Sequence, residues 1–162
     1  MMNYKKRLIS HLIIELKTIY QTALSAVKRA HSDATDKANI AENKYDTLGL
    51  EAAYLAQGLA KRASECNANL EAIQNLAAVE YSSSDAIVIG TLVKLIDQNE
   101  KPLLLFLAPV SGGLKFVFEE RTITVITSSS PLGKQLLGKY ADDEFEMVIG
   151  KHKDVYLISE LN

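Results

Sequence analysis

The sequence has few of the residues that build disulfide frameworks and zinc sites. In 162 residues there is one cysteine, Cys66, no tryptophan and only three histidines. A lone cysteine cannot form an intramolecular disulfide, which favours a reducing cytoplasm as the location of the protein. The histidines His11, His31 and His152 are far apart in the sequence and have no cysteine partner, so no zinc site is expected.

Long apolar runs are also missing. The first residues, MMNYKKRLISHLIIELK, start with basic side chains and an apolar patch, as a signal peptide does. However, His11, Glu15 and Lys17 interrupt the patch, and no small-residue cleavage site follows. No run approaches the ~20 apolar residues that a membrane span needs. The sequence predicts a soluble cytoplasmic protein with no membrane partner.

Motifs of known catalytic sites are absent as well. The sequence has no G-x-S-x-G motif, no Walker motif and no dinucleotide fingerprint. The short Ser-Gly-Gly stretch at 111–113 is more typical of a hairpin turn than of a phosphate-binding loop. We therefore expect a protein that is not an enzyme by itself and that has no small-molecule substrate.

The first half of the chain has almost no helix breakers. No proline precedes Pro102, and Gly49 and Gly58 are the only glycines in residues 1–80. Apolar residues recur there at alternating steps of three and four, which predicts two long helices that pack antiparallel as a coiled-coil hairpin over residues 1–78. The two predicted stripes are Ile9, Leu12, Leu16, Ile19, Ala23, Ala26 and Ala30, and then Tyr45, Leu48, Ala52, Leu55, Leu59, Leu70 and Ile73, with alanines 53, 56, 60 and 63 beside the second.

The second half changes to runs of strand length that are rich in β-branched and aromatic residues. Residues 78–85, AVEYSSSD, are polar and predict a linker. Pro131 is well placed as the first residue of a short helix capped by Ser130. The pattern predicts an α+β domain over 84–162, with one short helix and an antiparallel sheet. Its five predicted strands are 86–97, 101–109, 114–128, 144–150 and 153–161.

Acidic residues gather where the two helices are expected to turn. The stretch 33–46, DATDKANIAENKYD, holds Asp33, Asp36, Glu42 and Asp46 against two lysines. Capping explains one or two of these acids, with Asp36 or Asn39 as candidate N-caps of the second helix. Hard ions such as Mg²⁺ prefer carboxylate oxygens. Acids on a thin hairpin could therefore complete a metal site inside a partner that already holds a metal and a phosphodiester.

Residues in both halves then point to a known family. Ser130-Pro131-Leu132-Gly133, followed by Leu136-Leu137-Gly138-Lys139 and Asp142-Asp143, resembles the GreA/GreB family of bacterial transcript cleavage factors. Glu42-Asn43, shortly before Tyr45, is a second match. The resemblance covers nearly the whole chain and implies an FKBP-like C-terminal domain.

The resemblance also implies partners and site residues. The C-terminal domain would dock at the secondary channel of bacterial RNA polymerase through Ser129, Ser130, Pro131, Leu132 and Gly133. The hairpin would carry its acidic tip to the polymerase's Mg²⁺ and stimulate cleavage of backtracked RNA on the DNA template. The acids expected to act there are Glu42 and Asp36, supported by Asp33, Asn39, Asn43 and Asp46. No cofactor would be bound by the chain alone, and a monomer is expected.

Two departures from the family pattern leave alternatives open. The family normally has an aspartate where this chain has Asn39, and often an aspartate at the position of Ser129. Asn39 favours a channel regulator that does not stimulate cleavage, while Glu42 and Asp36 favour a cleavage factor. An FKBP-like domain also raises a prolyl isomerase, but only four phenylalanines and no tryptophan are available for its aromatic pocket. A plain coiled-coil adaptor would leave the Ser-Pro-Leu-Gly segment without a role.

Overall fold

The computed structural model describes residues 3–35 and 48–162, which form two compact units. One unit is Ile13–Glu71, and the other combines Met1–Leu12 with Ala72–Asn162. The first turns of the N-terminal helix thus belong with the sheet. Each unit is considered by itself below.

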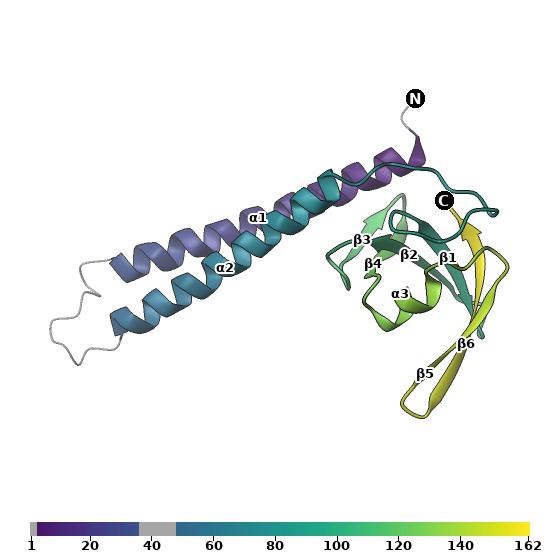
Figure 1. Cartoon of the computed structure of the whole chain (residues 1–162). Helices are drawn as coiled ribbons and strands as arrows, with labels where there is room; N and C mark the ends of the chain where they lie inside the picture. Colours follow the sequence, from purple (N-terminus) through teal and green to yellow (C-terminus); the bar gives the residue numbers. More distant parts are fainter. Residues whose placement is uncertain (1–2, 36–47) are drawn as a thin grey trace. The chain divides into compact units, whose positions relative to one another are not determined.

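The helical unit contains most of two long helices. Helix α1 is Tyr4–Thr35 and helix α2 is Leu48–Gln74, and the two run side by side over much of their length (Figure 1). Leu16, Ala30, Ala63 and Leu70 are buried, as the predicted stripes require. Leu55 was predicted to lie on the buried stripe of α2, but its side chain is 61% exposed, so this prediction is wrong. None of the described helices is long and apolar enough to cross a membrane.

The sheet unit contains six strands and one short helix, so the predicted class, a helical hairpin followed by a small sheet domain with one short helix, is confirmed. The strand order is β3-β4-β2-β1-β6-β5. The strands and the helix are β1 Leu92–Asp97, β2 Pro102–Ala108, β3 Lys115–Phe118, β4 Arg121–Thr127, α3 Pro131–Leu136, β5 Glu144–Ile149 and β6 His152–Leu161.

Two details of the sheet differ from the prediction. The run 114–128, predicted as one strand, folds as the β3–β4 hairpin, because Glu119 and Glu120 form a turn with φ of 48° and 63°. The sheet is also not purely antiparallel, since β2 pairs with β4 in parallel while the other four pairings are antiparallel. After β2 the chain forms β3 at the edge of the sheet and turns back as β4. Strand β4 therefore lies between β3 and β2 and runs parallel to β2.

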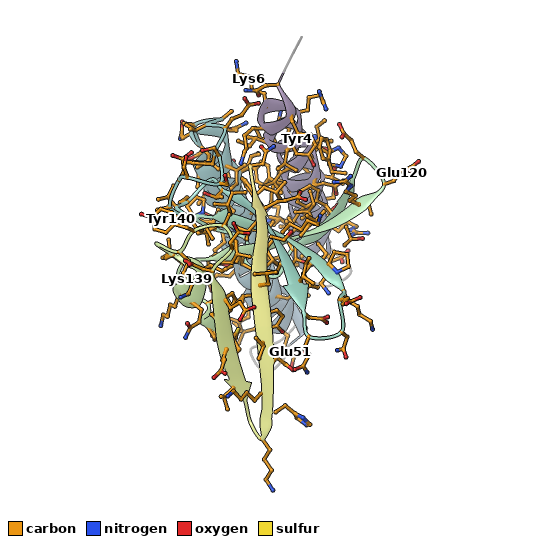
Figure 2. The ribbon with its side chains drawn as sticks, turned by 90° about the vertical axis from the view of Figure 1, so that its right-hand side faces the viewer. Tyr4, Lys6, Glu51, Glu120, Lys139 and Tyr140 are labelled. Carbon is orange, nitrogen blue, oxygen red and sulfur yellow. The ribbon has the colours of Figure 1, made fainter. Side chains whose placement is uncertain are left out.

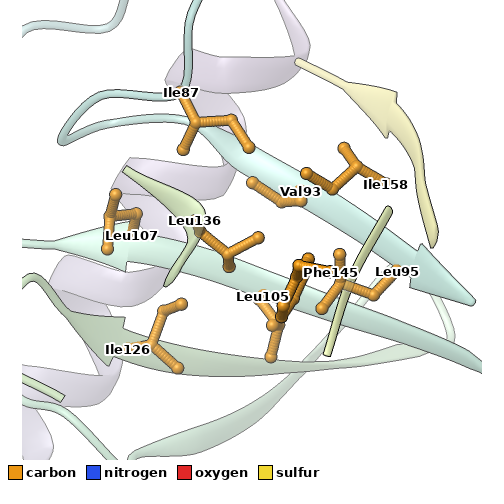
Figure 3. Close-up of a cluster of buried hydrophobic side chains, with 9 residues drawn as sticks. All are labelled: Ile87, Val93, Leu95, Leu105, Leu107, Ile126, Leu136, Phe145 and Ile158. Carbon is orange, nitrogen blue, oxygen red and sulfur yellow. The ribbon is translucent and has the colours of Figure 1, made fainter. Parts of the chain in front are cut away.

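One face of the sheet carries the main core. Side chains from β1, β2, β4, β5 and β6 meet Leu136 of α3 there, and Ile87 closes the cluster from the loop before β1 (Figure 3). Burial of large apolar side chains contributes ~1.5–3 kcal/mol each, which makes this cluster the main source of the unit's stability. The cluster consists of Ile87, Val93, Leu95, Leu105, Leu107, Ile126, Leu136, Phe145 and Ile158.

The first turns of α1 pack against buried residues that point away from this core. The ring of Tyr4 meets Phe118 edge-on at 5.4 Å, and His11 stacks on Phe116 at 5.8 Å between ring centroids. Lys5, which follows Tyr4 in α1, is fully buried. Its Nζ donates hydrogen bonds to the main-chain oxygens of Gly90, at 2.7 Å, and Asn162.

The β3–β4 turn gives a test of backbone strain. A two-residue hairpin turn with positive φ at both positions is normally built from Asn-Gly, because a Cβ is disfavoured there. Glu120 lies at the end of this hairpin (Figure 2). We expect Glu120→Gly to raise the free energy of unfolding of the sheet unit by about 0.5–1 kcal/mol.

The free energy of unfolding is measured by urea titration, with the amide NMR signals of β3 and β4 as the readout. Glu120→Ala is the matched control, since it removes the same carboxylate but keeps a Cβ. An equal gain in both variants would show that charge, and not backbone conformation, is responsible. Glu119 is left unchanged because its Oε1 accepts a hydrogen bond from Nη2 of Arg7 at 2.7 Å.

Candidate functional site

The predicted docking segment, residues 129–133, surrounds the start of α3. Strand β4 ends at Thr127, and Ser130 is the N-cap of α3 with extended backbone angles of φ −69° and ψ 152°. Its Oγ accepts a hydrogen bond from the Gly133 N–H at 3.0 Å and donates one to the Thr127 carbonyl at 2.7 Å. Pro131 follows as the first residue of the helix, where no N–H partner is needed.

Gly133 is required by close packing. A Cβ placed on Gly133 would lie 2.0 Å from the Thr127 carbonyl oxygen, a distance that no real contact allows. The helix therefore lies directly on the end of β4. At its other end, Leu136 is fully buried in the core cluster, and the N–H of Gly138 bonds to the Ile87 carbonyl at 2.9 Å. These contacts hold α3 rigidly on the sheet.

The residues of this segment divide into buried and exposed groups. Gly133 is buried, Ser130 and Leu132 are half-buried, and Ser129 and Pro131 are exposed. The inner residues thus hold the helix, while Ser129 and Pro131 lie on the surface. The hydroxyl of Ser129 lies 3.0 Å from that of Thr127.

Sequence reasoning did not select two exposed residues that follow α3. Leu137 is 40% exposed and Tyr140 is 48% exposed, although both are large and carry apolar surface. The main-chain N–H of Tyr140 bonds to Oδ2 of Asp143 at 2.8 Å, which fixes the turn after the helix. The available signal was the apolar Leu136-Leu137 pair, in which Leu136 is the last residue of α3 and Leu137 is its C-cap.

Of the predicted acidic stretch 33–46, the structure describes only residues 33–35. Asp33 is exposed in the last turn of α1. Asp36, Asn39, Glu42, Asn43 and Asp46 lie outside the described residues, so their predicted roles stay predictions. Among the residues that are described, no group of three or more His, Cys, Asp and Glu side chains could hold a metal ion.

Comparison with known proteins gives matches to one family. No protein-family model matches the chain. The transcription elongation factor GreA of Novosphingobium aromaticivorans is 31% identical over 80 residues, which are 49% of this chain and 46% of that protein. The GreA of Rhodospirillum rubrum is 25% identical over 139 residues, 86% of this chain and 83% of that protein. In the first of these matches the aligned part spans about half of the relative's length.

Solved structures give neighbours with the same family name. The crystal structure of GreA factor homolog 1 from Thermus thermophilus aligns with 98% of this chain and 94% of its own, at 19% identity and a TM-score of 0.38. The chain is thus similar in sequence to the GreA transcription elongation factors, and the resemblance to the GreA/GreB family that its motifs indicate is confirmed.

Proposed function

We propose that this protein is a transcription elongation factor that binds the secondary channel of bacterial RNA polymerase and stimulates cleavage of backtracked RNA. The observation that supports the proposal most strongly is the sequence similarity to curated GreA factors, one of which aligns over 86% of this chain. The fold supplies the two parts that such a factor needs. These are a helical hairpin and a sheet unit with a rigidly held helix, α3.

The sheet unit would bind the polymerase surface through the residues around α3. Ser129 and Pro131 are exposed at its start, and Leu137 and Tyr140 add exposed apolar area after its end. An exposed apolar surface with a polar rim is typical of a protein interface. Because Ser130, Gly133 and Leu136 fix the helix, this surface is preorganised and loses little conformational entropy on binding.

The acids of the tip would act on a metal that belongs to the partner. Glu42 and Asp36 would supply carboxylate oxygens to the polymerase's Mg²⁺ and help to orient water for attack on the RNA. In this proposal the chain is not a catalyst by itself. It uses backtracked RNA and the DNA template only within the elongation complex, and it acts as a monomer in the cytoplasm.

The proposal is tested on stalled, backtracked elongation complexes supplied with Mg²⁺. We expect the protein to shorten the RNA, and we expect Glu42→Gln to slow shortening by about 100-fold, as is typical when a group that stabilises charge in the transition state is lost. Asp36→Asn should have a smaller effect of the same sign. Glu51→Gln is the matched control, because Glu51 is an exposed acid in the first turn of α2, outside the predicted tip.

Binding is measured separately, so that docking and chemistry can be distinguished. Ser129→Arg should weaken binding to polymerase without changing the fold, because Ser129 is exposed. Shortening that survives both tip substitutions would remove the acids from the mechanism. Failure of the unmodified protein to bind polymerase would overturn the proposal as a whole.

A second candidate function is supported by Asn39. The amide of asparagine offers a neutral oxygen and adds no negative charge to a Mg²⁺ site. A protein with this tip could occupy the channel and regulate transcription without stimulating cleavage. Binding without RNA shortening would favour this function, and a gain of shortening in Asn39→Asp would identify Asn39 as its cause.

A further inference from the structure

A groove crosses the face of the sheet that lies opposite the main core. Val93, Leu95 and Leu105 point into that core, so the alternating residues Lys94 and Leu104 point to the other face. A cavity of about 400 Å³ opens there and is lined by Lys94, Pro102, Leu104, Arg121 and Thr122. We call this cavity and its extension the sheet groove.

The extension is a second cavity of about 200 Å³. It shares Lys94, Leu104 and Arg121 with the first and continues toward Tyr4 and Glu160. Three shared side chains make the two cavities adjoining parts of one groove over β4, β2, β1 and β6. The larger cavity falls within the range of ~300–1,000 Å³ that is usual for small-molecule sites.

The lining combines an apolar floor with positive charge. Leu104 and Pro102 of β2 supply apolar surface between the two cations, Arg121 on β4 and Lys94 on β1. Arg121 is exposed and forms no ion pair within the described part of the chain. A guanidinium presents its N–H groups in a fork that matches the oxygens of a phosphate or carboxylate.

Lys94 forms a weak ion pair with Glu160. Its Nζ lies 2.9 Å from Oε1 of Glu160, but the two side chains are 32% and 67% exposed. An ion pair that is exposed to this extent contributes little to stability, so an incoming anion can compete with Glu160 for the lysine. Glu160 therefore limits the affinity of the groove for anions.

We propose that the sheet groove binds a small amphipathic anion, with its apolar body on Leu104 and Pro102 and its phosphate or carboxylate on Arg121 and Lys94. Apolar contact and charge are both required, because neither an exposed arginine nor a shallow apolar floor binds a small molecule well alone. The site is independent of the polymerase function proposed above. The proposal concerns binding of the ligand and no chemical change to it.

Four probes separate the two requirements. Phenyl phosphate and benzoate carry both an apolar ring and an anion, inorganic phosphate carries only charge, and benzyl alcohol carries only the apolar body. The full chain labelled with ¹⁵N is titrated with each probe, and amide shifts are followed by NMR. We expect phenyl phosphate and benzoate to bind with millimolar dissociation constants, as their size allows, and to shift amides of β1, β2 and β4. Phosphate and benzyl alcohol should bind about tenfold more weakly.

Three variants test the assigned roles. Arg121→Gln should weaken phenyl phosphate binding about tenfold, whereas Lys115→Gln, which changes an exposed cation on β3, should leave it unchanged. Glu160→Gln should strengthen binding about threefold, because it releases Lys94. All three positions are on the surface, and the NMR spectra report directly whether each variant is folded.

Three results of these titrations would overturn the proposal. Equal affinity for phenyl phosphate and inorganic phosphate would show a simple anion site and overturn the proposal. So would shifts that map outside β1, β2, β4 and β6, or an Arg121→Gln variant that binds as the unmodified protein does. If phenyl phosphate binds tightly and benzoate does not, the anion is assigned as phosphate, and the reverse result assigns it as carboxylate.

Discussion

Replacing Gly133 with alanine will destabilise the sheet unit by roughly 3 kcal/mol or more, because the new Cβ collides with backbone and not with a movable side chain. The collision is with the Thr127 carbonyl oxygen, at 2.0 Å. To relieve it, α3 must move away from β4. That movement breaks the two hydrogen bonds through Ser130 Oγ and lifts Leu136 out of the core.

The measurement is the free energy of unfolding from urea titrations, monitored through the amide NMR signals of β1 and β2 for Gly133→Ala and of α2 for its control. Gly58→Ala is the matched control, since nothing lies within 4 Å of a Cβ at that position in the middle of α2. There the same substitution should stabilise the helix by up to ~1 kcal/mol. A Gly133→Ala protein as stable as the unmodified one would show that α3 is not held against β4 as described.

Gly133→Ala also tests the proposed docking surface around α3. At a temperature where Gly133→Ala is still folded, the displaced α3 should weaken binding to RNA polymerase. Ser130→Ala provides a graded comparison, because loss of an N-cap costs about 1 kcal/mol while leaving the glycine contact intact. We expect its stability to fall between those of Gly133→Ala and the unmodified protein.

The second large effect is a pH dependence that arises from Lys5. Burial lowers the pKa of the Lys5 amine from 10.5 to about 8, and the negative charge of Glu80 opposes this shift only in part. The surrounding groups are Gly90, Asn162, and the rings of Tyr81 and Phe106 at 5.3 and 5.6 Å. Both main-chain oxygens accept hydrogen bonds from the amine.

The direction of this pH dependence follows from the protonation of Lys5 in the folded and unfolded states. Between pH 8 and 10.5 the folded protein has lost the Lys5 proton while the unfolded chain still binds it, so raising the pH favours folding. The cost of burying the charged amine is fully present below pH 8 and disappears as the pH approaches 10.5. The resulting gain is at most about 3 kcal/mol for this shift.

The test compares the unmodified protein with Lys5→Met at pH 7.5, 9 and 10. Methionine fills a similar volume and does not titrate, so we expect the stability difference between the two proteins to change steadily in favour of lysine as the pH rises. Lys6→Met, an exposed neighbour, should give no such trend. Burial also raises the pKa of Tyr4 and of Tyr156, which affects stability above about pH 10, but these tyrosines are present in both proteins. A flat difference would contradict a charged, buried Lys5.

Much of the organisation could be predicted because it depends on local sequence. The absence of proline before Pro102 and the three-four apolar spacing predict the long helices, and α1 and α2 are found. Ser130 and Pro131 carry their own signal for the start of a helix, and α3 begins at Pro131. Such patterns are readable because helix periodicity and capping involve only residues a few positions apart.

The β3–β4 turn and the exposure of Leu55 could not be predicted from the local sequence. Glu119 and Glu120 form a turn without any glycine or asparagine to signal it, so two strands were predicted as one. The spacing that placed Leu55 on the buried stripe also fits several neighbouring positions, and only the packing of α2 against α1 selects among them.

The sequence by itself determined the fold class, the start of α3 at Pro131 and the similarity to GreA factors, since each depends on short-range patterns or on direct comparison of residues. Only the tertiary structure decided that Gly133 must lack a side chain, that Lys5 in the first turn of α1 is buried, and that Lys94 and Arg121 share one groove. The physical reason is the same in each case. These properties arise between strands and helices that are distant in the chain, and no local pattern records which of them will pack together.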